Sequence, residues 1–449
     1  PELPSRRPAA RAMSRAGDDL SAIGLYDAIA KARPRTRWGK EATFLAANLR
    51  FLTGHYKESI EVFDQFLVLT DKPATKPTTE PPTEKPATEK ADPQEGNRRE
   101  ARRARAMAML LLGHVRAAKA LHELTEGEDY EADSFAIGRI ELMQAAALQK
   151  SEDAGGAISL LTALRTRHAY GYLDLAARRR LAELGQKLPG FPAGPIASPA
   201  APVLPSPADL LFGAGLSREA RALLPKLPKG DDAQRCATLA QLDAGADAYV
   251  VGVKLDVSVP PASGWTWRCA YPTPYAEVVE ALEARERLPR GLIHSILRQE
   301  SAFRLDVVSP AGAVGIAQLM PQTAATTAKA AGLTLDETDL VALEVPFVQL
   351  DLCARHLHTL YIEMGADPAT ATPESTARAT PLVIAAYNAG ALAVKRWLAD
   401  AGTLDSDIFL ERIPYLETRG YAARVYGNLV RYAIIAGTEP PVMPAKLLK

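Results

Sequence analysis

A glutamate at the end of an apolar helical pattern is the clearest sign of chemistry in this sequence. The members of the pattern, Ile293, Ile296, Leu297 and Glu300, lie at positions i, i+3, i+4 and i+7, so they should share one helix face. That face would turn toward a core and place the Glu300 carboxyl beside apolar groups. Burial raises a carboxyl pKa and keeps the group protonated near neutral pH, as a general acid requires. The alternative is an exposed ion pair with Arg304, worth only about 0.3 to 0.5 kcal/mol.

The segment after this helix has the signals of a tight loop. It reads SPAGAVGIAQLMPQTA from Ser309, and its glycines Gly312 and Gly315 predict a turn. Pro321 is placed to begin the next helix, since proline is favoured at the first helical position. We therefore expect a loop that closely follows Glu300.

Two later segments carry polar groups near helix ends. The sequence AAYNAG ends an apolar helical pattern at Gly390, which is suited to a helix C-cap. The sequence IPYLETRGY, residues 413–421, follows a proline and contains Glu417 and Arg419.

These four segments, in this order and spacing, resemble the catalytic domain of soluble lytic transglycosylases, bacterial murein-cleaving enzymes with a lysozyme-like fold. The resemblance covers roughly residues 265–437 and begins with WRCAYPTPY at residues 267–275. It implies an all-α catalytic domain, peptidoglycan glycan strands as the substrate and no cofactor.

The resemblance assigns the role of sole catalytic acid and base to Glu300. The substrate-binding positions that it implies along a sugar groove are Ser309, Gln318, Met320, Ala386, Tyr387, Asn388 and Glu417. The family usually reads GLMQ where this chain reads GIAQ, so Ala317 replaces a methionine. We expect this difference to reshape one wall of the pocket more than it changes the chemistry.

Each of these side chains also has a purely structural interpretation. Tyr387 could be a core aromatic, Asn388 a helix cap and Met320 a filler of irregular space. Glu417 and Arg419 could form a local ion pair. The four motifs together favour the sugar-groove interpretation.

The nearest candidate for a second catalytic carboxyl group is Asp306. A continuous helix would turn it about 240° from Glu300 and move it roughly 9 Å along the axis, so the two would not converge. A single-acid mechanism therefore fits better than the usual pair of carboxylates. As the resemblance implies, the product is a 1,6-anhydromuramoyl end formed without water. The alternatives are a hydrolytic muramidase of the same fold and a non-catalytic periplasmic scaffold that binds glycan.

The rest of the chain predicts several helical segments, because apolar residues make up 47% of it and alternating strand patterns are scarce. Polar, proline-broken composition marks a disordered linker. The expected order is a helical repeat segment (1–70), the linker (71–97), a second repeat segment (98–188), a Pro/Ala-rich connector (189–207), a helical linker domain (208–264), the catalytic domain (265–437) and a C-terminal tail (438–449).

A weak repeat begins at Gly54 and again at Gly113, 59 residues later. Without the roughly 25-residue linker the period is about 34, that of tetratricopeptide-type helix pairs. Gly17 and Gly156 match the pattern less well. We therefore predict an α-superhelical N-terminal region, the alternative being a generic helical bundle. Such a region could bind glycan or periplasmic protein partners.

Charge and cysteine content restrict the remaining function classes. Lys plus Arg and Asp plus Glu both number 53, so no net field favours nucleic acid or membrane. The basic run at residues 98–105 is expected to be the solvated start of a helix. The three cysteines, Cys236, Cys269 and Cys353, allow one disulfide and lack metal-ligand spacing, so no metal is expected. No apolar run is long enough to span a membrane and no targeting segment is present, so a periplasmic or outer-membrane-associated location is inferred from where murein lies.

Overall fold

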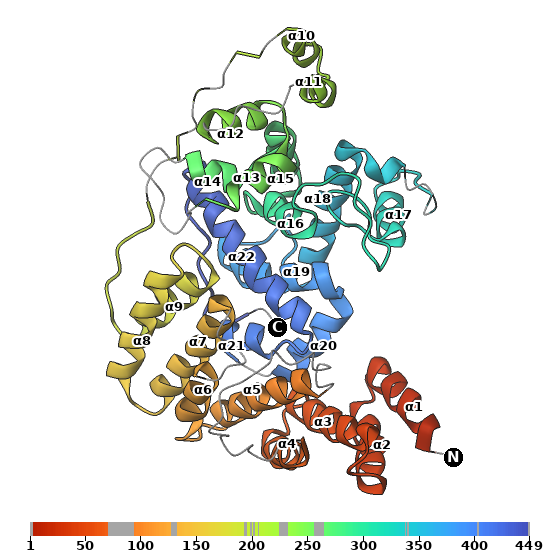
Figure 1. Ribbon diagram of the computed structural model, residues 1–449, viewed down its shortest axis with the longest axis vertical. Coiled ribbons are helices and arrows are strands. Elements are labelled where there is room, and N and C mark those ends of the chain that lie inside the picture. The colour runs from red at the N-terminus through yellow and green to blue at the C-terminus, as the bar shows by residue number, and fades with distance from the viewer. Residues whose placement is uncertain are drawn as a thin grey trace, which may run out of the picture. The chain divides into compact units, whose positions relative to one another are not determined.

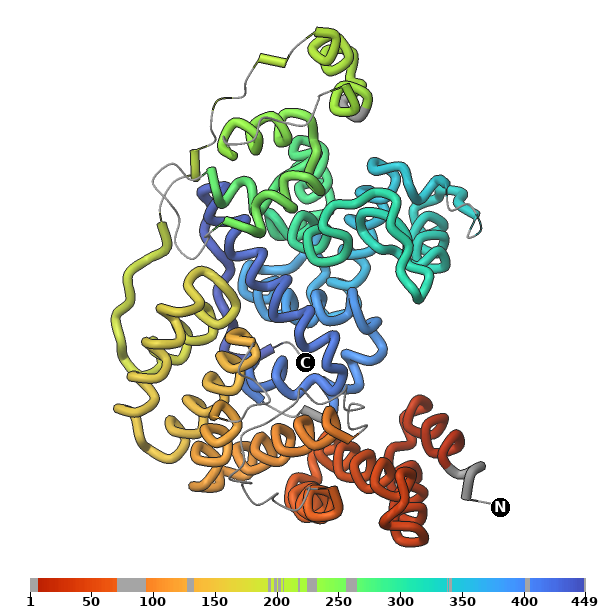
Figure 2. The backbone as a smooth tube through the Cα atoms, in the orientation of Figure 1, coloured from red at the N-terminus to blue at the C-terminus, as the bar shows by residue number. Residues whose placement is uncertain are grey.

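The protein is all-α in the computed structural model (Figures 1 and 2). The structure describes residues 3–447 apart from 71–93, 127–132, 193–194, 198–199, 201–202, 205, 224–231, 256–264, 337, 339–340 and 402–403. Most of the predicted linker, residues 71–93, lies outside the described residues. Across the described ranges β-structure is limited to isolated bridges, and no helix there combines the length and apolar character needed to cross a membrane. The chain divides into two compact units, described separately below.

The first unit comprises residues 1–164 with the short segments 396–404 and 411–414. Each helix from α1 to α6 packs against the next, and α3 and α5 also pack on α5 and α7, respectively. Contacts between successive and next-but-one helices are typical of an α-solenoid. The helices are α1 (Leu3–Ala16), α2 (Asp19–Ala32), α3 (Arg37–Leu52), α4 (Tyr56–Thr70), α5 (Glu95–Leu111), α6 (Ala117–Thr125), α7 (Ser134–Lys150) and α8 (Ala154–Arg167).

The turns at the two predicted repeats are closed by the same hydrogen bonds. Gly54 and Gly113 both have positive φ, of 83° and 71°. The next residue in each turn, His55 or His114, donates its amide to the carbonyl five residues earlier, at 2.8 and 2.9 Å. Gly17, with φ of 92°, closes the turn between α1 and α2 in the same way. Gly156 instead lies inside α8.

The basic run at residues 98–105 is only partly solvated, contrary to the sequence expectation. It lies in α5, which begins at Glu95, inside the last residues of the predicted linker. Arg98 and Arg103 are buried. Arg98 donates to the Thr70 carbonyl at 3.1 Å, and Arg103 donates to the Glu411 carbonyl at 2.9 Å. Backbone carbonyls at segment ends therefore accept hydrogen bonds from two of these arginines. The periodicity of the sequence alone could not show these contacts.

The second unit comprises residues 165–395, 405–410 and 415–449. Its long helix α22 packs against α9, α16 and α19, and α18 packs against α15, α16 and α19. The helices that begin in this unit are α9 (Tyr172–Glu183), α10 (Ala208–Gly213), α11 (Ser217–Leu223), α12 (Asp232–Gln241), α13 (Gly245–Gly252), α14 (Trp265–Ala270), α15 (Ala276–Glu286), α16 (Leu292–Glu300), α17 (Pro321–Ala330), α18 (Pro346–Glu363), α19 (Pro373–Ala389), α20 (Ala391–Ala401), α21 (Ser406–Arg412) and α22 (Leu416–Ala436).

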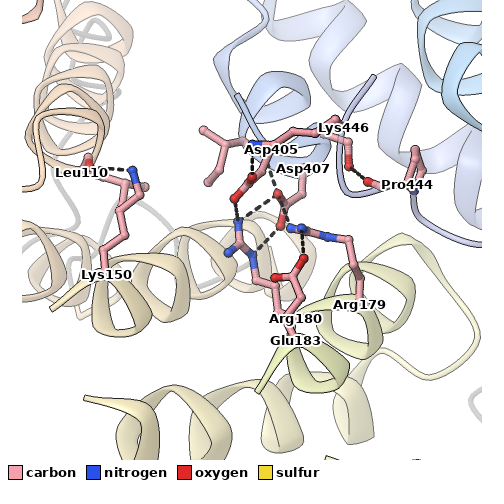
Figure 3. Close-up of polar contacts among 11 residues, drawn as sticks. Leu110, Lys150, Arg179, Arg180, Glu183, Asp405, Asp407, Pro444 and Lys446 are labelled. Atoms are coloured by element: carbon pink, nitrogen blue, oxygen red, sulfur yellow. Dashed lines mark hydrogen bonds and ion pairs between the residues drawn. The ribbon is translucent and has the colours of Figure 1, made fainter. Parts of the chain in front are cut away.

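A buried ion-pair network joins α9 to the start of α21 (Figure 3). Asp407 is fully buried and accepts from Arg179 at 2.7 Å and from Arg180 at 2.6 Å. The more exposed Asp405 pairs with Lys446 at 2.6 Å. The two guanidinium groups hold the pKa of the Asp407 carboxyl below its ordinary value against the opposing effect of burial.

Two further links hold together parts of the second unit. A disulfide joins Cys236 on α12 to Cys269 on α14, with their Cα atoms 5.5 Å apart. The segment predicted as a C-terminal tail packs onto the helices: Met443 is buried, and the Tyr426 hydroxyl donates to the Val442 carbonyl at 3.1 Å.

Candidate active site

Glu300 is the last residue of α16 and is partly exposed. The apolar members of its stripe, Ile293, Ile296 and Leu297, are fully buried. The predicted helix face therefore forms as expected, with the carboxyl at the edge of the core. Arg304 does not neutralise it, because the Arg304 Nε donates to the Ser301 carbonyl at 3.0 Å.

Tyr421 on α22 is the hydrogen-bond partner of Glu300. Its hydroxyl donates to Oε1 at 2.6 Å. Burial raises the pKa of Glu300 to about 7, and the nearby charge of Glu417 adds to this rise, whereas the Tyr421 hydrogen bond opposes it. A carboxyl group with such a pKa exchanges its proton readily at neutral pH, which is the property required of a group that acts first as acid and then as base.

A buried glutamate, Glu283, holds the opposite end of the same helix. Glu283 on α15 is 3% exposed and accepts the amides of Gly291 at 2.9 Å and Ile293 at 3.0 Å. These amides belong to the first turn of α16, whose N–H groups have no partner within the helix. Burial nevertheless raises the pKa of Glu283 to about 7. Glu283 therefore fixes where the helix that carries Glu300 begins.

The loop after Glu300 is tied directly to the end of α16. The hydroxyl of Ser301 donates to the Ile316 carbonyl at 2.7 Å. Within the loop, Val314 forms isolated bridges with Val308 and Leu319. The predicted turn and the helix start at Pro321 both form. The loop is therefore held at a fixed distance from the Glu300 backbone.

Gln349 on α18 organises the centre of this loop. It is fully buried, accepts the Ala317 amide at 2.8 Å and donates to the Val314 carbonyl at 2.6 Å. Gly315 lies against it with φ of 74°, and a Cβ there would stand 2.5 Å from the Gln349 amide nitrogen. Only glycine fits this close approach in a left-handed conformation.

Three predicted binding residues lie in or beside the loop. Ser309 closes it: its hydroxyl accepts the Ala313 amide at 3.0 Å. The side-chain amide of Gln318 donates to the carbonyls of Val307 and Gly315, both at 2.9 Å. Met320 precedes α17 and is 42% exposed, so it presents apolar surface to solvent.

Tyr387 on α19 connects the AAYNAG segment to the loop. Its hydroxyl donates to the Ala317 carbonyl at 2.8 Å and contacts the Sγ of Cys353 at 3.6 Å. Its ring lies 5.5 Å from that of His356. Ala317 is itself fully buried, so its backbone holds Tyr387 while its side chain packs internally.

The remaining predicted residues lie where α19 ends and α22 begins. Gly390 caps α19, as expected, by donating its amide to the Ala386 carbonyl at 2.8 Å. The side chain of Asn388 accepts from the Thr418 hydroxyl at 2.5 Å. Glu417 is exposed in the first turn of α22, one helical turn before Tyr421.

The structure thus brings the loop, α19 and α22 into one hydrogen-bonded arrangement around the end of α16. Sequence reasoning missed Tyr421, Glu283 and Gln349, each of which acts across the fold. Tyr421 had one available signal, since it lies four residues after Glu417 and therefore on the same helix face.

Comparison with known proteins identifies the family of one domain in this chain. Residues 277–410 match the protein family described as a transglycosylase SLT domain. The chain therefore carries such a domain, and the resemblance seen in its motifs is confirmed.

The chain matches only about a quarter of the length of its curated relative from Escherichia coli K12. The soluble lytic murein transglycosylase of Escherichia coli K12 is 31% identical over 176 residues, which are 39% of this chain and 25% of that protein. An inactive mutant of the lytic transglycosylase Slt from Pseudomonas aeruginosa has a TM-score of 0.58 at 22% identity, over 96% of this chain and 63% of that one. The 70-kDa soluble lytic transglycosylase of E. coli has a TM-score of 0.52 at 18% identity, over 97% of this chain and 69% of that one. These likenesses confirm the predicted fold class, a helical superhelix followed by an SLT domain.

Proposed function

We propose that this chain is a murein lytic transglycosylase in which Glu300 is the single catalytic acid and base. The observation that carries the proposal is the position of Glu300: a partly exposed carboxyl at the end of a buried helix, with a pKa of about 7 and the Tyr421 hydroxyl on one oxygen. The SLT domain and relatives named soluble lytic murein transglycosylases support it.

The proposed reaction returns the proton to Glu300. Protonated Glu300 donates to the glycosidic oxygen between N-acetylmuramic acid and N-acetylglucosamine, and the N-acetylglucosamine leaves as an alcohol. The substrate's own N-acetyl oxygen supports the positive charge at C1. The Glu300 carboxylate then takes the proton of the muramoyl 6-hydroxyl, whose oxygen closes onto C1. The product is a 1,6-anhydro end, and no water is consumed.

The loop and the ends of α19 and α22 would form the groove around this carboxyl. Met320 and Glu417 are exposed and could contact sugar directly. Ser309, Gln318, Ala386, Tyr387 and Asn388 all bond to neighbouring backbone or side chains, so we expect them to shape the groove as well as touch substrate. We expect the protein to act in the periplasm or at the outer membrane, where murein is accessible.

Digestion of purified murein tests the proposal. Wild type should release anhydromuramoyl products, and Glu300→Gln should lose at least about 10²-fold in rate because general acid and base catalysis are both removed. Glu374→Gln, an equal charge change at an exposed position of α19, should match wild type. Release of anhydro products by Glu300→Gln at the wild-type rate would refute the role of Glu300.

One observation favours a hydrolytic muramidase as the second candidate. The charge of Glu417 contributes to the raised pKa of Glu300, so a second carboxylate acts on the site, and a hydrolytic enzyme would use such a group to activate a water molecule. Mass spectrometry separates the two outcomes, since hydrated reducing ends are one water heavier than anhydro ends. Retained murein binding without any release would instead indicate a glycan-binding scaffold.

A further inference from the structure

A cavity of about 810 Å³ lies between α1, α2 and α3 of the first unit. Its walls are mostly apolar, with Tyr26, Ile29, Ala42 and Leu45 among the lining residues. Tyr26 and Ile29 are buried, so the floor of the cavity belongs to the core that joins the three helices. Its volume is in the range of sites that enclose drug-sized ligands.

The cavity is also lined by an excess of cations. Arg7, Arg11 and Arg15 recur every four residues on α1, which places them along one helix face, and Arg33 follows α2. In the described part of the chain, the one carboxylate that pairs with any of these four is Glu41, which both Arg7 and Arg11 contact. Three positive charges therefore remain without a balancing carboxylate.

The Arg7 side chain can donate a further hydrogen bond. Its Nε atom is buried and has no hydrogen-bond partner among the described residues. Its guanidinium carbon lies 4.3 Å from the ring centroid of Trp38, which also lines the cavity. Stacking on an aromatic ring fixes a guanidinium plane in position to bind a carboxylate through two parallel hydrogen bonds.

Trp38 supplies an exposed apolar wall. Half of its surface, 50%, is open to solvent although it adjoins the cavity. Tryptophan and arginine are the residue types that contribute most to protein recognition sites, where a buried anchor is surrounded by polar contacts. An exposed tryptophan beside a cavity rimmed by arginines has this composition.

From this arrangement we infer that the cavity between α1, α2 and α3 binds an acidic peptide segment of another protein. One large apolar side chain of the peptide fills the cavity, and flanking Asp or Glu carboxylates pair with the arginines. The hydroxyl groups of a glycan would find few hydrogen-bond partners on an apolar floor of this size. An acidic peptide, in contrast, supplies carboxylates that pair with the arginines. The inference is independent of the proposed murein chemistry, which belongs to the second unit.

Fluorescence anisotropy with the full chain tests the inference. The probes are three labelled seven-residue peptides: Glu-Asp-Glu-Phe-Asp-Glu-Asp, the same peptide with serine in place of phenylalanine, and Lys-Lys-Lys-Phe-Lys-Lys-Lys. We expect the first to bind at least about tenfold more tightly than the other two, and more weakly as salt is raised.

Variants locate the site. Arg15 and Arg33 are exposed and form no ion pair in the described structure, so Arg15→Glu with Arg33→Glu should fold normally and weaken binding at least about tenfold. Lys57→Glu with Lys119→Glu makes the same charge change on α4 and α6 and should bind like wild type. Trp38→Ala should weaken binding without altering its dependence on salt.

Three results would overturn the inference. Equal binding of the serine peptide would reduce the site to a non-specific cation patch. Tighter binding of a labelled single-stranded oligonucleotide would assign the arginines and Trp38 to a nucleic acid. Absence of binding by the phenylalanine peptide, or unchanged binding by the Arg15→Glu and Arg33→Glu variant, would remove the peptide site from this cavity.

Discussion

The hydroxyl of Tyr421 donates a hydrogen bond of 2.6 Å to the carboxyl of Glu300, 121 residues earlier in the chain. It links α22 to the last residue of α16. The same bond favours the ionised carboxyl, whereas burial and the nearby charge of Glu417 favour the protonated one, so the pKa of about 7 is the balance of these opposing effects.

Removal of this bond should move the pH dependence of activity. In Tyr421→Phe, the pKa of Glu300 should rise further, because the interaction that stabilises the carboxylate is lost while burial remains. The alkaline limb of the rate profile should therefore shift to higher pH. The turnover number should fall about 10- to 100-fold at pH 7, because the carboxyl is less well positioned. Measurement of murein turnover between pH 5 and 9 would check this, and a shift to lower pH would contradict it.

Glu283 should make the start of α16 less stable as pH rises. Its folded pKa of about 7 lies above its ordinary value of 4.5, so the folded state binds the proton more tightly than the unfolded state. The contribution of Glu283 to the free energy of unfolding is fully present below about pH 4.5. It falls by about 3 kcal/mol as pH rises through 7.

Hydrogen exchange at two amides reads this effect locally. The free energy of opening measured at Gly291 and Ile293 should decrease from pH 5 to pH 7.5, and Glu283→Gln should reduce that decrease. The comparison is made in a Glu300→Gln background, because Glu300 titrates in the same range. A pH dependence that is identical in both proteins would exclude Glu283 as its source.

Asp407 should stabilise the second unit, and its contribution should grow as pH rises, which is the opposite of the effect of Glu283. Asp407→Asn removes the fully buried carboxylate that pairs with both Arg179 and Arg180, leaves them with Glu183 and the more exposed Asp405, and should destabilise the second unit by about 3 to 5 kcal/mol. Asp405→Asn, at a more exposed position of the same network, should cost only about 0 to 1 kcal/mol (Figure 3). Urea denaturation measures both. Because the pKa of Asp407 is lowered, its contribution is present above pH 3.8 and is lost at more acidic pH. Equal costs for the two variants would contradict the assignment.

The disulfide should stabilise the region that precedes the catalytic helices. Cys236→Ser with Cys269→Ser opens a loop of 33 residues and should lower stability by about 2 to 4 kcal/mol. Thermal unfolding with and without a reductant measures the effect. The reductant should lower the melting temperature of wild type and leave that of the double variant unchanged; a shift of equal size in both would mean that the reductant acts elsewhere.

Local patterns predicted the elements that carry the site. The apolar stripe before Glu300, the turn at Gly315, the helix start at Pro321 and the cap at Gly390 all form where short-range rules place them. These features depend on backbone geometry within a few residues, so the sequence alone contains them.

Contacts between distant segments were not predictable in this way. Gln349 reaches the site from α18 and has no unusual local sequence. Tyr421 reaches it from α22, and within its segment, residues 413–421, the sequence indicated Glu417 as the binding residue. The burial of Arg98 and Arg103 was also missed, because their carbonyl acceptors lie 28 and 308 residues away. A charged run is normally solvated, and only the folded chain shows which of its members have a buried partner.

Cys353 offers a chemical measure of how often the packing beside Tyr387 opens. It is the one cysteine outside the disulfide, it is buried beside Tyr387, and burial raises the pKa of its thiol to about 12. A thiol reagent can therefore modify it only when the packing around Cys353 opens far enough to admit water and the reagent. The rate of that modification, with no label introduced, would report how often this packing opens at rest and whether added murein slows the opening.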